Sequence, residues 1–135
     1  MKIAEQGAAG AMSGNAPLRI SIVDDDASIR EALKSLMRSV QFDVEAFGSA
    51  EAFLASERSH HTSCLILDLY LPGMNGFDLQ NHLNQEQRRI PIIFITAHAD
   101  EISRQRALKA GAIDLLSKPV RREPLFKAIQ SAIQR

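Results

Sequence analysis

The stretch Cys64-Leu-Ile-Leu-Asp-Leu-Tyr-Leu-Pro-Gly-Met-Asn-Gly76 joins a short apolar run to an aspartate and then to a turn. Its first four side chains are apolar on both faces of an extended chain, which is the pattern of a central strand in a parallel sheet. Asp68 ends that strand, and Leu71 to Gly76 has the composition of a turn that leads into a helix. The stretch therefore predicts an α/β protein with an acidic group at the carboxyl end of a buried strand.

Short apolar runs alternate with helical periodicities on both sides of this stretch. Further strands are predicted at 18–23, 43–47, 91–95 and 113–116. Helices are predicted at 29–40, from Ser49 to about Glu57, from Asn75 or Gly76, from about Asp100 to Ala110, and around 124–133. Five strands that alternate with five helices predict a doubly wound parallel sheet with helices on both faces. In such sheets ligands bind beyond the carboxyl ends of the strands.

The 135 residues correspond to one folded domain, which we expect over 18–135, preceded by a flexible tail over 1–17 that is rich in Gly, Ala and Ser. No apolar run is long enough to span a bilayer, and the start of the chain lacks the pattern of a secretory signal. The single cysteine, Cys64, cannot form an internal disulfide, which favours a reducing, cytoplasmic location.

The formal net charge is zero, but the charges are unevenly distributed. Residues 1–85 carry an excess of five acidic side chains, and residues 86–135 carry an excess of five basic ones. Arg121, Arg122 and Lys127 have no interleaved aromatic residues, so we interpret them as a solvated helix face. We expect no direct nucleic-acid binding by this domain.

Polar residues stand at the ends of four predicted strands: Asp24-Asp25-Asp26, Asp68, Thr96 and Lys118. The carboxyl ends of parallel strands meet at one edge of the sheet, so these side chains are expected to converge. Clustered carboxylates repel one another unless a cation lies between them, and Mg²⁺ prefers such oxygen ligands. With a hydroxyl and an ammonium opposite the acids, the set is typical of a phosphoryl-transfer site. Asp26 is expected to begin a helix rather than to bind metal.

Four motifs in order resemble the receiver domain of two-component response regulators, and the His98-Ala99-Asp100 that follows Thr96-Ala97 resembles the FixJ type. The four motifs are ISIVDDDASIR at 20–30, LILDLYLPGMNG at 65–76, FITA at 94–97 and KAGAIDLLSKP at 109–119. The resemblance covers about residues 17–135 and implies a flavodoxin-like (βα)₅ sandwich with strand order 2-1-3-4-5.

The resemblance also implies a role for each residue at the strand ends. Asp68 would accept a phosphoryl group from a histidine kinase, with Mg²⁺ as cofactor. Asp24, Asp25, Asp68 and the backbone carbonyl of Tyr70 would hold the metal. Thr96 would follow the phosphoryl group, and Lys118 would pair with its oxygens.

The chain departs from the family at the switch position three residues before Lys118, where an aromatic residue is usual and Leu115 stands here. A leucine has no ring to turn inward, so we expect the loop from Thr96 to Asp100 to move as a backbone unit, which comparing free and beryllofluoride-bound forms would test. Tyr70 and His98 occupy the positions that flank the attacking water in the family. Tyr70 is expected to shield the phosphoryl group and lengthen its lifetime, whereas His98 either orients a water or is a surface residue.

We therefore interpret the chain as a signalling switch that catalyses only its own phosphorylation and dephosphorylation, not as a metabolic enzyme. Its partners would be a sensor kinase or phosphotransfer protein and an output domain or target, reached through the fourth helix, fifth strand and fifth helix, with homodimerisation left open. Two alternatives remain: a Mg²⁺-dependent hydrolase with an aspartyl nucleophile, and a pseudo-receiver that binds partners without phosphorylation. Whether a C-terminal output domain follows residue 135 also stays open.

Overall fold

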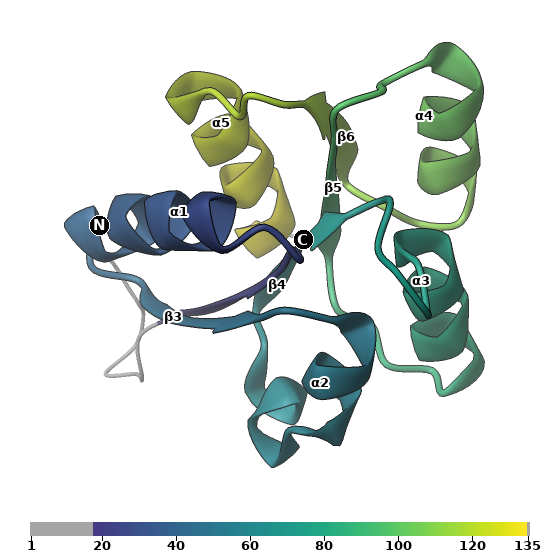
Figure 1. Ribbon diagram of the computed structural model, residues 1–135, viewed down its shortest axis with the longest axis horizontal. Helices are drawn as coiled ribbons and strands as arrows, with labels where there is room; N and C mark the ends of the chain where they lie inside the picture. The colour runs from purple at the N-terminus through teal and green to yellow at the C-terminus, as the bar shows by residue number, and fades with distance from the viewer. Residues whose placement is uncertain (1–17, 135) are drawn as a thin grey trace.

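The computed structural model describes residues 18–134, and the tail expected over 1–17 lies outside the described residues (Figure 1). The strands are β2 (Arg19–Val23), β3 (Asp43–Phe47), β4 (Cys64–Asp68), β5 (Ile92–Thr96) and β6 (Asp114–Ser117). The helices are α1 (Ala27–Ser39), α2 (Ala50–Ala55), the 3₁₀ helix η1 (Glu57–His61), α3 (Gly76–Gln85), α4 (Glu101–Lys109) and α5 (Arg122–Ile133). Of the helices in 18–134, none combines the length and apolarity that crossing a bilayer requires.

The five strands form one sheet in the order β3-β2-β4-β5-β6, and every pair is parallel. In chain order this is the 2-1-3-4-5 arrangement, so the predicted fold class is confirmed. β4 lies at the centre of the sheet, and all five of its residues are buried. The carboxyl ends of all five strands therefore lie at the same edge of the sheet.

Helices cover both faces of the sheet (Figure 1). An apolar cluster of side chains lies between the helices and the sheet on each face. Successive side chains of a strand point to opposite faces. On β4, Leu65 and Leu67 pack in the layer formed with α2, α3 and α4, whereas Cys64 and Ile66 pack in the layer formed with α1 and α5. The absence of polar residues from the first four positions of β4 follows from this double burial.

Short polar side chains cap every helix of residues 18–134 except α5, which follows Arg121 without a side-chain cap hydrogen bond. The side chain of Asp26 accepts hydrogen bonds from the N–H groups of Ser28 and Ile29 at the start of α1, which confirms it as a helix-entry residue. Ser49 caps α2, and Asn75 forms a reciprocal capping box with Asp78 at α3.

The second helix is shorter than predicted. We expected it to run from Ser49 to about Glu57, but α2 ends at Ala55 and Ser56 adopts an extended conformation. The hydroxyl of Ser56 accepts a hydrogen bond from the N–H of Arg58 and begins η1. A serine side chain competes with the helix for backbone groups in this way, and periodicity alone does not reveal it.

Gly76, the first residue of α3, allows this helix to begin directly against β4. Its N–H donates to the carbonyl of Leu69 at 2.9 Å. A Cβ atom at this position would lie 2.7 Å from the carbonyl oxygen of Asp68, 2.9 Å from Cα of Leu69 and 3.0 Å from the ring of Phe94. The glycine therefore sets the distance between α3 and the end of the strand that carries Asp68.

We predict that Gly76→Ala destabilises the protein by about 1–3 kcal/mol, the usual cost of overpacking, because backbone atoms cannot move away from the new methyl group. Helix propensity alone predicts the opposite sign, a gain of up to about 1 kcal/mol. Urea unfolding measures the difference. In the control Gly48→Ala, the new Cβ meets only the flexible end of Arg30 at 3.4 Å, so a change within about 0.5 kcal/mol is expected. Stabilisation by Gly76→Ala would contradict the steric argument.

Candidate phosphoryl-transfer site

Three aspartates come together where β2 and β4 end. Asp24 and Asp25 follow β2, and Asp68 is the last residue of β4. One carboxylate oxygen from each lies within 4.8 Å of the other two. Asp24 and Asp68 are buried, whereas Asp25 is exposed, so the cluster opens to solvent on the side of Asp25. The predicted convergence of these acids is present in the structure.

Lys118 follows β6, the edge strand beyond β5, and its ammonium contacts this cluster. Its backbone N–H donates to the carbonyl of Thr96 at 2.8 Å. Its Nζ lies 2.9 Å from Oδ2 of Asp24 and 3.2 Å from Oδ2 of Asp68. Burial by itself would lower the pKa of Lys118, but the two carboxylates outweigh it and raise that pKa. Lys118 is therefore held charged between the two buried acids.

The electrostatics of Asp68 differ from those of a solvated aspartate. Burial raises its pKa, and the neighbouring negative charge of Asp24 raises it further. Lys118 and the N–H of Tyr70, which donates to Oδ1 of Asp68 at 3.3 Å, act in the opposite direction without cancelling the increase. The ionised Asp68 is thus more basic than an exposed aspartate.

Asp24 is fixed by contacts with its own neighbourhood. Its Oδ1 accepts the N–H of Asp26 at 2.8 Å. Its carbonyl oxygen accepts the guanidinium of Arg30 at 2.6 Å. The sequence did not single out Arg30. Its position four residues after Asp26 places it one turn into α1, close to the end of β2. Arg30 orients the backbone of Asp24 and leaves the carboxylate free to face the cluster.

Thr96 ends β5, beside the end of β4 in the sheet, and is fully buried. Its Oγ1 accepts the N–H of His98 at 3.1 Å. A threonine hydroxyl has one proton to donate besides its lone pairs, so accepting this bond leaves the O–H available to an anionic oxygen. The hydroxyl of Thr96 thus lies at the same edge of the sheet as Asp68, and its expected role toward a phosphoryl group stays a prediction.

Tyr70 and His98 lie together at the surface near the strand ends. Tyr70 is 55% exposed, and its ring centroid is 6.3 Å from that of His98 in an edge-to-face arrangement. Leu115, by contrast, is buried in β6 beside Phe94, and its carbonyl accepts a long hydrogen bond from Arg104 of α4 at 3.4 Å. The roles expected for these three residues stay predictions.

The acidic cluster fits a divalent cation. Oδ2 of Asp24 is buried and has no hydrogen-bond partner among residues 18–134, although the Lys118 ammonium lies close to it. Three carboxylates contribute only oxygen atoms, which are the ligands that Mg²⁺ prefers. Asp24, Asp25 and Asp68 are therefore the residues that could hold a metal ion.

Comparison with known proteins agrees with this geometry. The family model described as "Response regulator receiver domain" matches residues 20–130. The chain belongs to the response regulator receiver family. It is a receiver domain of two-component signalling. Receiver domains bind Mg²⁺ in an acidic pocket and work with histidine kinases and output domains.

Individual relatives extend over about the same residues. The chain is 47% identical over 116 residues to nodulation protein W of Bradyrhizobium diazoefficiens, covering 86% of this chain and 51% of that protein. The response regulator StyR has a TM-score of 0.79 at 45% identity, with 88% of this chain and 60% of that chain covered. FixJ-N has a TM-score of 0.79 at 34% identity, with 90% and 97% covered. The receiver chain thus spans about half the length of the curated relatives it matches.

The raised pKa of Asp68 gives a prediction for Asp68→Asn in metal-free buffer. Above the raised folded pKa, the fold carries the cost of an ionised Asp68, whereas below the ordinary aspartate pKa of 3.8 it does not. We expect Asp68→Asn to be more stable than wild type at neutral pH, with the advantage shrinking as the pH falls toward 3.8. Urea unfolding at several pH values measures it.

Asp26→Asn is a control in which the change in stability has the opposite sign, because hydrogen bonds from Ser28 lower the pKa of Asp26. Its contribution to stability is present above pH 3.8 and is lost as the pH falls through the folded pKa. If the free energy of unfolding of wild type and Asp68→Asn depended on pH in the same way, the raised pKa of Asp68 would be contradicted.

Proposed function

We propose that this receiver accepts a phosphoryl group on Asp68 from a histidine kinase or phosphotransfer protein, with Mg²⁺ as cofactor. The observation that carries the proposal is the placement of Asp68 itself. It is a buried carboxylate at a strand end, 3.2 Å from the Lys118 ammonium and clustered with Asp24 and Asp25. A lone strand-end aspartate would have neither the cation nor the two further acids.

The nucleophile of the transfer would be a carboxylate oxygen of Asp68. It forms a bond to phosphorus while the bond from phosphorus to the imidazole nitrogen of the donor breaks, and the electron pair remains on that nitrogen. The raised pKa of Asp68 supports this role, because a more basic oxygen is a better nucleophile. The product is an aspartyl phosphate on the receiver and a free histidine on the donor.

The other residues would neutralise and orient the phosphoryl group. Asp24, Asp25, Asp68 and the backbone carbonyl of Tyr70 would hold Mg²⁺, which when bound neutralises charge on the phosphoryl oxygens. Lys118 would exchange its contact with the Asp68 carboxylate for a contact with the phosphoryl oxygens. The free O–H of Thr96 would donate to the same group.

The output face proposed here consists of α4, β6 and α5. α4 has a single buried residue, Ala107, and an ion pair of 2.6 Å between Arg104 and Asp114 connects it to β6. A helix with so little buried apolar surface is repositioned at low cost. Since Leu115 cannot supply a turning ring, we propose that the backbone of 96–100 transmits the change from Thr96 to α4, which then acts on an output domain, a target protein or a second receiver.

The decisive experiment is incubation with Mg²⁺ and acetyl phosphate followed by intact mass measurement. We expect a single phosphoryl adduct that is absent without Mg²⁺ and absent from Asp68→Asn. Asp26→Asn is the matched control. The Asp26 side chain bonds the first N–H groups of α1, and asparagine also caps helices in this way. This variant should be modified like wild type.

Two other outcomes would replace the proposal. Rapid turnover of many phosphoesters would indicate the aspartyl-nucleophile hydrolase. The absence of both adduct and turnover would indicate a pseudo-receiver that acts by binding alone.

Tyr70 is expected to control how long the phosphoryl group lasts. Its ring, exposed beside His98, would shield the phosphoryl group from water. Tyr70→Ala should therefore shorten the lifetime several-fold, because water would reach phosphorus more easily. Loss of the adduct over time, followed by mass after removal of acetyl phosphate, measures the rate. Tyr70→Phe is the control, since it keeps the ring and should stay close to wild type, and an unchanged rate in Tyr70→Ala would sink the shielding idea.

A further inference from the structure

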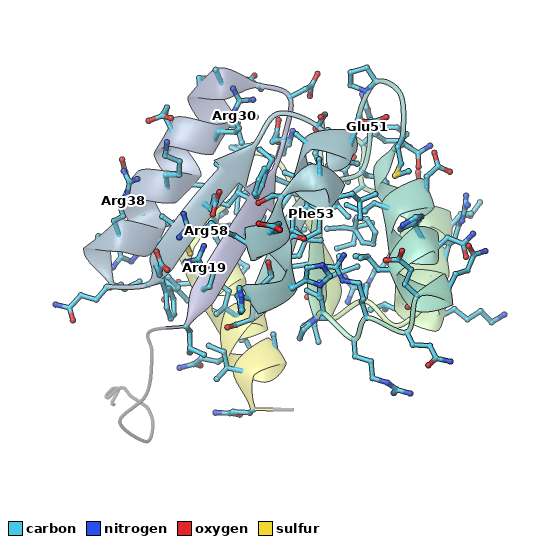
Figure 2. The ribbon with its side chains drawn as sticks, turned by 90° about the horizontal axis from the view of Figure 1, so that it is seen from below. Arg19, Arg30, Arg38, Glu51, Phe53 and Arg58 are labelled. Atoms are coloured by element: carbon cyan, nitrogen blue, oxygen red, sulfur yellow. The ribbon has the colours of Figure 1, made fainter. Side chains whose placement is uncertain are left out.

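Glu51 makes a contact that connects α2 to the loop between β4 and α3. It lies in the first turn of α2, at the top of that helix in Figure 2. Its Oε2 accepts the backbone N–H of Met74 at 2.9 Å, which joins residues 23 positions apart in the chain. Because the loop over 69–75 starts directly after Asp68 and contains Tyr70, Glu51 reaches the segment that borders the phosphoryl site.

The loop is shaped to receive this carboxylate. Gly73 has φ +73°, and a Cβ atom on it would lie 2.7 Å from Oε2 of Glu51. The missing side chain therefore leaves the space that the carboxylate occupies. The hydrogen bond from Met74 is the main cause that lowers the pKa of Glu51, so the group that accepts it is ionised near neutral pH.

The two ends of the loop are held by other contacts. At its start, the N–H of Tyr70 donates to Asp68, and at its end the N–H of Gly76 donates to the carbonyl of Leu69. Leu71 is anchored by burial in the apolar layer. Pro72 and Gly73 are exposed, and Met74 packs partly against the same layer. For the backbone of residues 72–74, Glu51 is the one hydrogen-bond partner found within 18–134.

We propose that Glu51 is a positioning residue for the metal site: it holds the loop over 69–75 so that the backbone carbonyl of Tyr70 is preset for Mg²⁺. This inference rests on the proposed function, which assigns that carbonyl to the metal. Ordering a loop costs conformational entropy, and a loop that is already ordered in the metal-free protein does not lose that entropy when the ion binds. In this proposal Glu51 acts through the loop and would contact neither the metal nor the phosphoryl group.

Mg²⁺ titration of the full chain tests the proposal. Tyr70 is the only tyrosine and the chain has no tryptophan, so intrinsic fluorescence reports on this loop. We expect Glu51→Ala to weaken Mg²⁺ binding by about tenfold, the lower end of the effect seen for groups that orient metal ligands. Glu51→Gln should remain near wild type, because its amide oxygen can accept the same N–H.

Glu57→Ala is the matched control. It removes the same charge from an exposed glutamate in the first turn of η1, so an electrostatic effect of net charge would appear in both variants. Urea unfolding shows whether each variant is folded. In the metal-free wild type, the amide of Met74 should exchange its hydrogen more slowly than in Glu51→Ala.

The outcomes separate the two proposals. If wild type does not bind Mg²⁺ at all, the proposed function fails. If wild type binds it and Glu51→Ala binds it equally well, the positioning role fails while the proposed function stands. A Met74 amide that is unprotected in wild type also overturns the positioning role, whatever the variants show.

Discussion

Mutual repulsion of the carboxylates at the ends of β2 and β4 is the constraint around which the site is built. Asp24 and Asp68 are buried, and the negative charge of Asp24 raises the pKa of Asp68. Lys118 offsets this cost with contacts of 2.9 and 3.2 Å to the two acids. A single ammonium cannot satisfy three carboxylates, and Oδ2 of Asp24 lacks a hydrogen bond within residues 18–134. These three carboxylates are therefore oxygen ligands whose charge a further cation would neutralise.

The fold supplies this arrangement by its topology. β4 is central, β2 and β5 flank it, and β6 lies beyond β5, so residues more than ninety positions apart in the chain meet at one edge. Contacts behind that edge then hold each group in place. Arg30 fixes the backbone of Asp24, Gly76 lets α3 pack against Asp68, and Glu51 fastens the loop after it. The positions of the acids themselves are set by the strands, because Asp24 and Asp25 directly follow β2 and Asp68 ends β4.

The uneven charge distribution has a structural explanation at this edge. Four of the acidic residues in 1–85 are the strand-end aspartates Asp24, Asp25, Asp26 and Asp68, and they account for most of the local negative excess. The cation that opposes them, Lys118, comes from the basic part of the chain. The positive excess that remains includes Arg104 and Arg106 of α4 and Lys127 of α5, on the proposed output face. A zero net charge thus combines an acidic cluster at the strand ends with basic side chains on α4 and α5.

The sequence by itself determined the strands, the alternation with helices and the residues at the strand ends, because burial on both faces and helical periodicity are local patterns. Strand order came with the resemblance to a family, and the structure agrees. The predicted end of α2 was wrong, since the Ser56 hydroxyl accepts the N–H of Arg58 and begins η1 there. Only the tertiary structure decided the contacts of Arg30 and Glu51 and the raised pKa of Asp68. Each depends on distances between segments brought together by the sheet, and no spacing along the chain encodes those distances.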